Sequence, residues 1–133
     1  MEEITVHLEA EVNPTESEEK VKEAIQNVFG NISLQTKSSM KKTLITAEAN
    51  GKEALAKFYN LLVRDRIRAA ARSALLAGIQ KKAVIFCLNK QVAYAGHISF
   101  SEEIAESPLG PIKVKIESKN PHEIINWLTS INF

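Results

Sequence analysis

Three arginines spaced four residues apart form the clearest chemical pattern of the chain: Arg64, Arg68 and Arg72. On one continuous helix they would follow a single side, with about 6 Å between neighbours along the axis. This spacing is comparable to that of phosphates along a nucleic-acid strand, and a guanidinium group binds phosphate through a planar fork of donors. The pattern therefore predicts a phosphate-binding stripe. A surface helix with a solvated polar shoulder would show the same arginines, so that interpretation stays open.

Further basic residues extend this candidate site along the sequence. Residues 30–100 carry twelve bases and three acids, whereas residues 1–29 carry eight acids and two bases. A chain with a formal net charge of +1 can thus present one positive face to a polyanion. Lys41 and Lys42 are further candidates in a polar loop, and Tyr94 is a nearby aromatic that could stack a base. The predicted nucleic-acid-binding set is Arg64, Arg68, Arg72, Lys81, Lys82 and Lys90.

No pattern in the chain predicts catalysis or metal binding. His97 with Glu102 or Glu103 would be an acid–base group, but nothing in their spacing requires them to converge. Cys87 lies within an apolar run, which favours an inert core thiol over a nucleophile, and no second metal ligand has a recognisable spacing from His97. We therefore predict a protein that is not an enzyme and that has no catalytic residue, no metal and no cofactor.

The elements that must position the basic residues follow from the apolar periodicity. Alternation of period 2 predicts strands, and apolar faces repeating at i, i+3 and i+4 predict helices. Asn89 and Lys90 are expected to form the tight turn of a hairpin, since Asn tolerates positive φ. A break near Arg64 and Asp65 is expected to divide the long helical stretch in two, because the apolar face is interrupted there. The predicted order is β-α-β-β-α-α-β-β-β-α, over residues 4–12, 15–29, 32–36, 43–47, 52–63, 65–77, 83–88, 92–100, 112–117 and from 120 onward.

The composition is that of an ordinary globular protein, with 44% hydrophobic and 25% charged residues in 133. We predict one domain over residues 1–133, an α+β fold whose largely antiparallel sheet carries its helices mainly on one face. The N-terminal stretch is acidic and alternating, unlike a signal peptide, and no window approaches the ~20 apolar residues of a membrane span. We therefore expect a cytoplasmic protein that does not associate with membranes.

Four short stretches stand out together: Pro14-Thr15-Glu16, residues 67–76 (IRAAARSALL), residues 88–97 (LNKQVAYAGH) and residues 107–111 (SPLGP). In this combination the chain resembles, over nearly its whole length, an archaeal family of uncharacterised proteins, the UPF0201 type, described as predicted RNA-binding or exosome-associated. The resemblance implies a fold similar to that of the large-subunit ribosomal protein that binds 5S rRNA. It implies no catalytic residues.

The sequence thus favours a non-catalytic protein that binds RNA phosphates. The alternative is a protein-interaction or assembly domain, a homodimer or part of a larger assembly, that does not bind nucleic acid. Such a partner would meet an exposed strand edge or residues 127–133. A molecular mass that depends on protein concentration and does not respond to nucleic acid would distinguish this alternative.

Overall fold

The computed structural model describes residues 3–38, 42–101 and 110–129. Its described strands form one seven-stranded sheet in the order β2-β3-β1-β7-β5-β4, and the short β6 pairs with β5 as well. All of these pairings are antiparallel. The strands are β1 (Thr5–Val12), β2 (Leu34–Ser38), β3 (Thr43–Asn50), β4 (Ile79–Gln80), β5 (Ala83–Asn89), β6 (Phe100–Ser101) and β7 (Pro111–Glu117).

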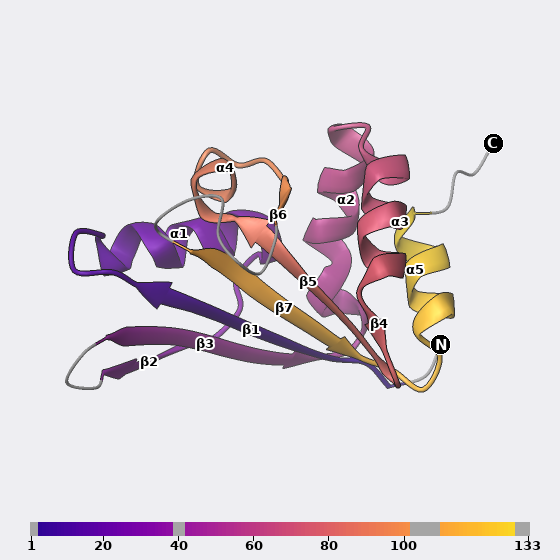
Figure 1. Ribbon diagram of the computed structural model, residues 1–133, viewed down its shortest axis with the longest axis horizontal. Coiled ribbons are helices and arrows are strands. Elements are labelled where there is room, and N and C mark those ends of the chain that lie inside the picture. The colour runs from indigo at the N-terminus through magenta and orange to yellow at the C-terminus, as the bar shows by residue number, and fades with distance from the viewer. Residues whose placement is uncertain (1–2, 39–41, 102–109, 130–133) are drawn as a thin grey trace.

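The helices cover one face of this sheet and leave the other face open (Figure 1). They are α1 (Glu18–Phe29), the 3₁₀ turn η1 (Lys52–Leu55), α2 (Ala56–Arg64), α3 (Arg68–Ala77), α4 (Lys90–Tyr94) and α5 (Pro121–Thr129). The predicted α+β class and the predicted succession of elements are confirmed, with β4 and α4 as two short additions. None of the described helices is long and apolar enough to cross a membrane.

The core lies between the sheet and the helices, and the strand alternation explains it. In β1 every second residue from Val6 to Val12 is buried, and the residues between them face the open side. Phe58 of α2 stacks between Phe29 of α1 and Phe86 of β5, with ring centroids 5.4 and 5.6 Å apart. These three rings fix two helices on the sheet.

The hairpin expected at Asn89 and Lys90 is wrong. Asn89 has extended backbone angles and acts as the N-cap of α4, because its side-chain oxygen accepts the Val92 N–H at 3.0 Å. Most of the expected strand over residues 92–100 is therefore helix and loop, and only Phe100–Ser101 pairs with β5. A short run with buried Lys90 and Ala93 fits one helical turn as well as a strand, so periodicity alone could not separate them.

The predicted break in the long helical stretch is confirmed, and it divides the arginine pattern. Arg64 ends α2, and Arg68 begins α3. Between them Arg66 adopts φ +56°, which reverses the chain so that α3 returns beside α2 (Figure 1). The continuous stripe of three arginines is therefore not formed.

Candidate nucleic-acid interface

The predicted basic residues lie on four different parts of the fold. Arg68 and Arg72 are on α3, and Lys81 and Lys82 form the turn between β4 and β5. Arg64 lies at the α2–α3 turn, and Lys90 lies on α4, away from α3 and α5 (Figure 1).

Lys90 is a structural residue and not a surface cation. Only 4% of it is exposed, and its ammonium group donates to Glu16 Oε1 at 2.9 Å and to the backbone carbonyl of Glu11. The contact joins α4 to the segment between β1 and α1. The prediction that Lys90 binds phosphate from a hairpin tip is therefore wrong in its geometry, because the lysine is turned inward against a carboxylate.

The partner carboxylate of this pair makes the fold sensitive to acid. Burial raises the pKa of Glu16, but the hydrogen bonds from the Asn13 N–H and the Lys90 ammonium outweigh it and hold the pKa below its ordinary value of 4.5. The unfolded chain then binds this proton more readily than the folded chain. Stability from Glu16 is consequently present above pH 4.5 and is lost as the pH falls through the lower pKa of the folded state.

We therefore expect a Glu16→Gln variant to have a flatter stability profile between pH 5 and pH 3 than the wild type. Urea unfolding followed by circular dichroism at several pH values measures both profiles. Because the other carboxylates are common to both proteins, the difference isolates Glu16. If the stability of the two proteins changed with pH in parallel, Glu16 would not be the source of the acid sensitivity.

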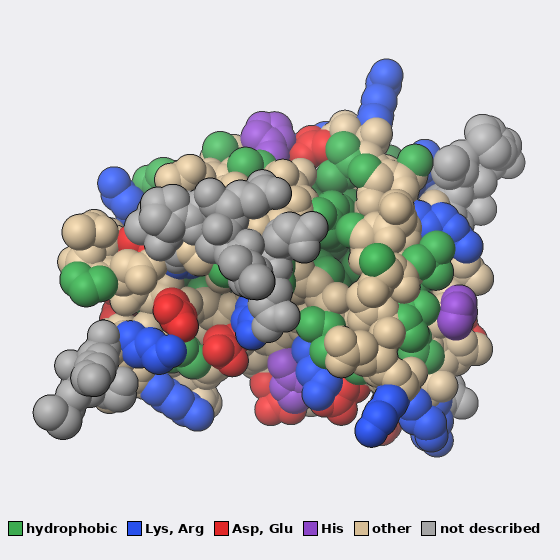
Figure 2. Space-filling view, viewed as in Figure 1, with side chains coloured by type: hydrophobic (Ala, Val, Ile, Leu, Met, Phe, Trp, Pro, Cys, Tyr) green, Lys and Arg blue, Asp and Glu red, His purple; other side chains and the backbone are tan. Residues whose placement is uncertain are grey.

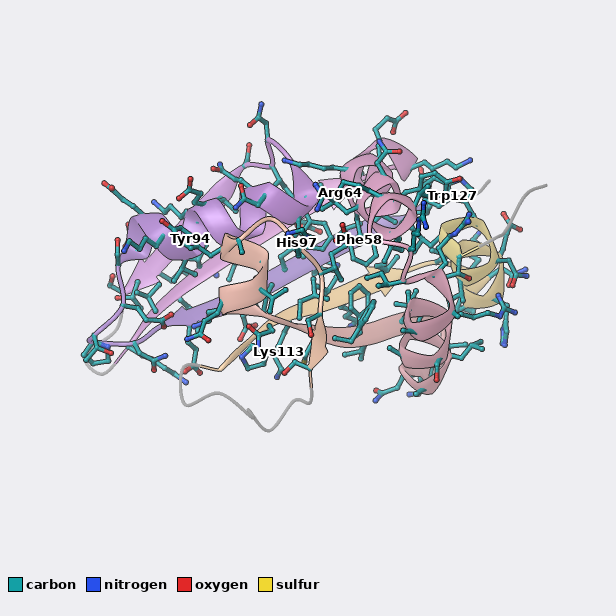
Figure 3. All side chains as sticks on the ribbon, turned by 90° about the horizontal axis from the view of Figure 1, so that it is seen from above. Phe58, Arg64, Tyr94, His97, Lys113 and Trp127 are labelled. Carbon is teal, nitrogen blue, oxygen red and sulfur yellow. The ribbon has the colours of Figure 1, made fainter. Side chains whose placement is uncertain are left out.

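Arg64 is held by its own surroundings, although about half of its side chain is exposed. Its guanidinium donates to Asp65 Oδ1 at 2.9 Å and to the carbonyl of Gly96 at 2.6 Å, and it lies 3.2 Å from His97 Nδ1 (Figure 3). The Arg64 hydrogen bond lowers the pKa of Asp65, against burial and with help from His97. Arg64 therefore ties the α2–α3 turn to the loop after α4.

The acid–base group considered from the sequence combined His97 with Glu102 or Glu103. In the structure His97 Nδ1 lies 3.2 Å from another carboxylate oxygen, Asp65 Oδ2. Glu102 and Glu103 lie outside the described residues, so that alternative is not tested. Among the described residues no group of three or more His, Cys, Asp and Glu side chains could hold a metal ion.

The remaining four predicted residues lie along one side of the molecule, with Arg68 at the start of α3 and Lys81 and Lys82 beyond the end of that helix (Figure 1). The carbonyl of Lys82 accepts the Ser118 N–H at 2.9 Å, which brings the β4–β5 turn beside Lys119. On the neighbouring helix Arg72 Nη1 donates to Asn126 Oδ1 at 2.8 Å and to Thr129 Oγ1 at 3.3 Å, so α3 lies along α5. Figure 2 shows Lys and Arg side chains on this side, below and beside the helices. We call this surface the basic end: Arg68, Arg72, Lys81, Lys82 and Lys119.

Lys119 is the member that the sequence did not predict. It follows β7, and the pairing of Ala83 with Glu117 in the structure shows that the start of β5 and the end of β7 are neighbours. A single lysine in a mildly acidic C-terminal third gives no local signal of that pairing. Its side chain is exposed, like those of Lys81 and Lys82.

Two aromatic residues could serve as stacking groups, at opposite ends of the molecule (Figure 3). Tyr94 is 43% exposed but belongs to α4, so the predicted stacking residue lies apart from the basic end. Trp127 of α5 is half-buried and stacks on Tyr59, with centroids 5.1 Å apart and planes 12° apart. The Lys52 ammonium lies 4.6 Å from the Trp127 centroid, a cation–π contact of about 0.5–1 kcal/mol at an exposed site.

The open face of the sheet forms a second candidate surface, a shallow depression of about 590 Å³. Its charges are of both signs. His7 lies 3.0 Å from Glu117 and 3.7 Å from Glu48, and Lys115 lies 3.6 Å from Glu117. Of the two further lysine candidates, Lys42 pairs with Glu11 at 3.0 Å, while Lys41 lies outside the described residues. This mixture attracts a polyanion less than the basic end does.

Comparison with known proteins identifies the family. A family model described as RNA binding matches residues 5–118. UPF0201 proteins of Sulfurisphaera tokodaii and Sulfolobus acidocaldarius are 43% and 42% identical to this chain, over 92% and 93% of it and 84% and 86% of their own lengths.

Solved structures agree with these sequence relatives. The crystal structure of a UPF0201 protein from Methanococcus jannaschii matches with a TM-score of 0.84 at 31% identity, over 94% of this chain and 98% of that one. A DUF54 protein from Methanothermobacter thermautotrophicus, at 19% identity and a TM-score of 0.71 over 97% of this chain and all of that one, shares the fold. The resemblance to an archaeal family is confirmed, and the chain belongs to the UPF0201 family.

Proposed function

We propose that this protein binds RNA through the basic end and performs no chemistry on it. The observation that supports this proposal is that three segments far apart in the sequence lie along one side of the molecule: α3, the β4–β5 turn and the segment between β7 and α5. The Lys82 carbonyl is bonded to the neighbour of Lys119, and Arg72, one turn from Arg68, is bonded to α5. The family model described as RNA binding supports the same reading. Exposed carboxylates lie nearby as well, Glu123 on α5 and Glu117 opposite Ala83 on β7, but the five basic side chains outnumber them.

The chemistry of the five residues suits phosphate. The two arginines can each offer parallel N–H donors to phosphate oxygens, and the three lysines act as mobile point charges. Affinity would then come mainly from released counterions and depend little on base sequence. For five contacts to a single strand, the logarithm of the affinity should fall with the logarithm of the salt concentration at a slope of about −3.5.

Charge reversal in the β4–β5 turn tests this proposal. We expect Lys81→Glu/Lys82→Glu to weaken the binding of a fluorescein-labelled RNA by roughly tenfold or more near 100 mM salt, and to reduce the slope by about 1.4. Fluorescence anisotropy across a salt titration measures both quantities. Both side chains are exposed, so circular dichroism should show an unchanged fold.

Lys20→Glu/Lys22→Glu is the matched control. It makes the same change in net charge on α1, outside the basic end. We expect this control to bind nearly as the wild type does. Equal losses in the two variants would show that only the overall charge matters, and full binding by Lys81→Glu/Lys82→Glu would remove the basic end from the interface.

One observation favours the alternative of an assembly domain. β2 lies at an edge of the described sheet, and its residues from Gln35 to Ser38 are exposed. Such an edge can pair with a strand of another chain. Sedimentation equilibrium tests this alternative, because an assembly through β2 predicts a mass that rises with protein concentration and is unaffected by RNA.

A further inference from the structure

We infer that Trp127 is a stacking platform for an unpaired base, so that the RNA bound at the basic end is single-stranded. This inference rests on the proposed RNA binding and adds the class of RNA. It assigns to α5 the stacking role that was predicted for Tyr94 from the sequence.

The indole ring of Trp127 is fixed before any ligand arrives. Tyr59 of α2 packs against it in a nearly parallel stack, and the ring also contacts the buried core. A ring held in this way loses little conformational freedom when a base stacks on it. Half-burial leaves part of the indole open to solvent.

The group that lies over the ring is one that a nucleotide can replace. Lys52 is an exposed side chain on the 3₁₀ turn before α2, and its ammonium lies 4.6 Å from the centroid of Trp127. A flexible four-carbon stem allows the ammonium to move aside and follow the phosphate of the incoming nucleotide. Stacking of a base on an aromatic ring is stronger than an exposed cation–π contact, so the exchange is favourable.

The platform adjoins the phosphate-binding surface. Asn126, the residue before Trp127, accepts the hydrogen bond from Arg72. Neighbouring helical residues point about 100° apart, so the arginine flanks one side of α5 and the indole the other. A strand that crosses the exposed side of α5 would contact both groups. Paired bases remain stacked within a duplex and cannot reach the ring, which gives the preference for single strands.

Trp127 also supplies the measurement, because it is the single tryptophan of the chain. We would titrate the protein with a 12-nucleotide oligouridylate and with an RNA duplex of 12 base pairs, following tryptophan fluorescence and the anisotropy of labelled RNA together. The expected result is saturable quenching by the single strand at the concentrations where anisotropy rises. The duplex should bind more weakly and leave the fluorescence unchanged.

Two variants separate stacking from folding. Trp127→Leu should weaken binding of the single strand by roughly 5- to 100-fold and leave duplex binding unchanged. Trp127→Phe retains an aromatic ring and should recover most of the loss, which excludes a folding defect as the cause.

The possible failures are distinguishable. RNA binding without quenching, and without loss in Trp127→Leu, would overturn the stacking platform while the proposed function stands. Quenching by the duplex as strong as by the single strand would also overturn it. If neither RNA raises the anisotropy, the proposed function itself fails, and the inference fails with it.

Discussion

Replacing Lys90 with methionine is expected to lower the free energy of unfolding by about 3 kcal/mol. The substitution leaves the Glu16 carboxylate without its ammonium partner in a largely buried position, and the loss of one member of a buried pair typically costs about 3–5 kcal/mol. We place the effect at the lower end because Asn13 still donates to Glu16, from its backbone N–H at 3.0 Å and from its amide at 2.8 Å.

Urea unfolding at pH 7 measures this loss, and Lys42→Met is the matched control. Lys42 pairs with Glu11 on the surface, where an ion pair contributes about 0.2–1 kcal/mol. The double variant Lys90→Met/Glu16→Gln also removes the negative charge that Lys90→Met leaves without its ammonium partner, and it should recover part of the stability. A Lys90→Met variant no less stable than Lys42→Met would show that Lys90 is not held as described.

Gly78→Ala is expected to lower the free energy of unfolding by a comparable amount, about 3 kcal/mol. Gly78 lies between α3 and β4, two elements that position the basic end. A Cβ atom at residue 78 would lie 1.9 Å from the backbone oxygen of Ile85, so β5 or the end of α3 has to move. Overpacking typically costs about 1–3 kcal/mol, and an overlap with backbone belongs at the upper end of that range. The Gly78 carbonyl also accepts the Ile85 N–H at 2.8 Å, a bond that this movement would strain.

Gly96→Ala is a suitable control for this second variant. Among the described residues, apart from the chain neighbours of Gly96, no atom lies within 4 Å of a Cβ at this position. The expected cost is therefore that of its φ of +88°, about 1–2 kcal/mol. Thermal unfolding of the two variants gives the comparison. Equal losses of stability in the two variants would contradict the close packing of Gly78 against β5.

The fold was largely predictable because its elements carry strong local signals. The alternation in β1 and the apolar face of α1 are long enough to determine both element type and buried side. Asn89 shows the limit of such signals, since the same residue type can form a tight turn or cap a helix, and the tertiary packing of α4 on α1 decides between them.

The candidate site was predictable only in part, because its geometry depends on contacts between distant residues. Lys90 and Glu16 are 74 positions apart, and no local pattern shows that the lysine turns inward. Arg64 is separated from Arg68 by a turn at Arg66 that a helical wheel does not represent. The basic character of the middle third, by contrast, is visible in the composition, and four of the six predicted residues lie along one side of the molecule, on α3 and at the β4–β5 turn.

The position of bound RNA is the central claim, and amide chemical shifts test it most directly. We would titrate the uniformly ¹⁵N-labelled protein with a 12-nucleotide oligouridylate and record the amide resonances at each step. RNA bound at the basic end should concentrate the shift changes in three segments, residues 66–72, 80–83 and 118–128. Changes concentrated on the open face of the sheet, at His7, Lys113 and Lys115, would contradict it.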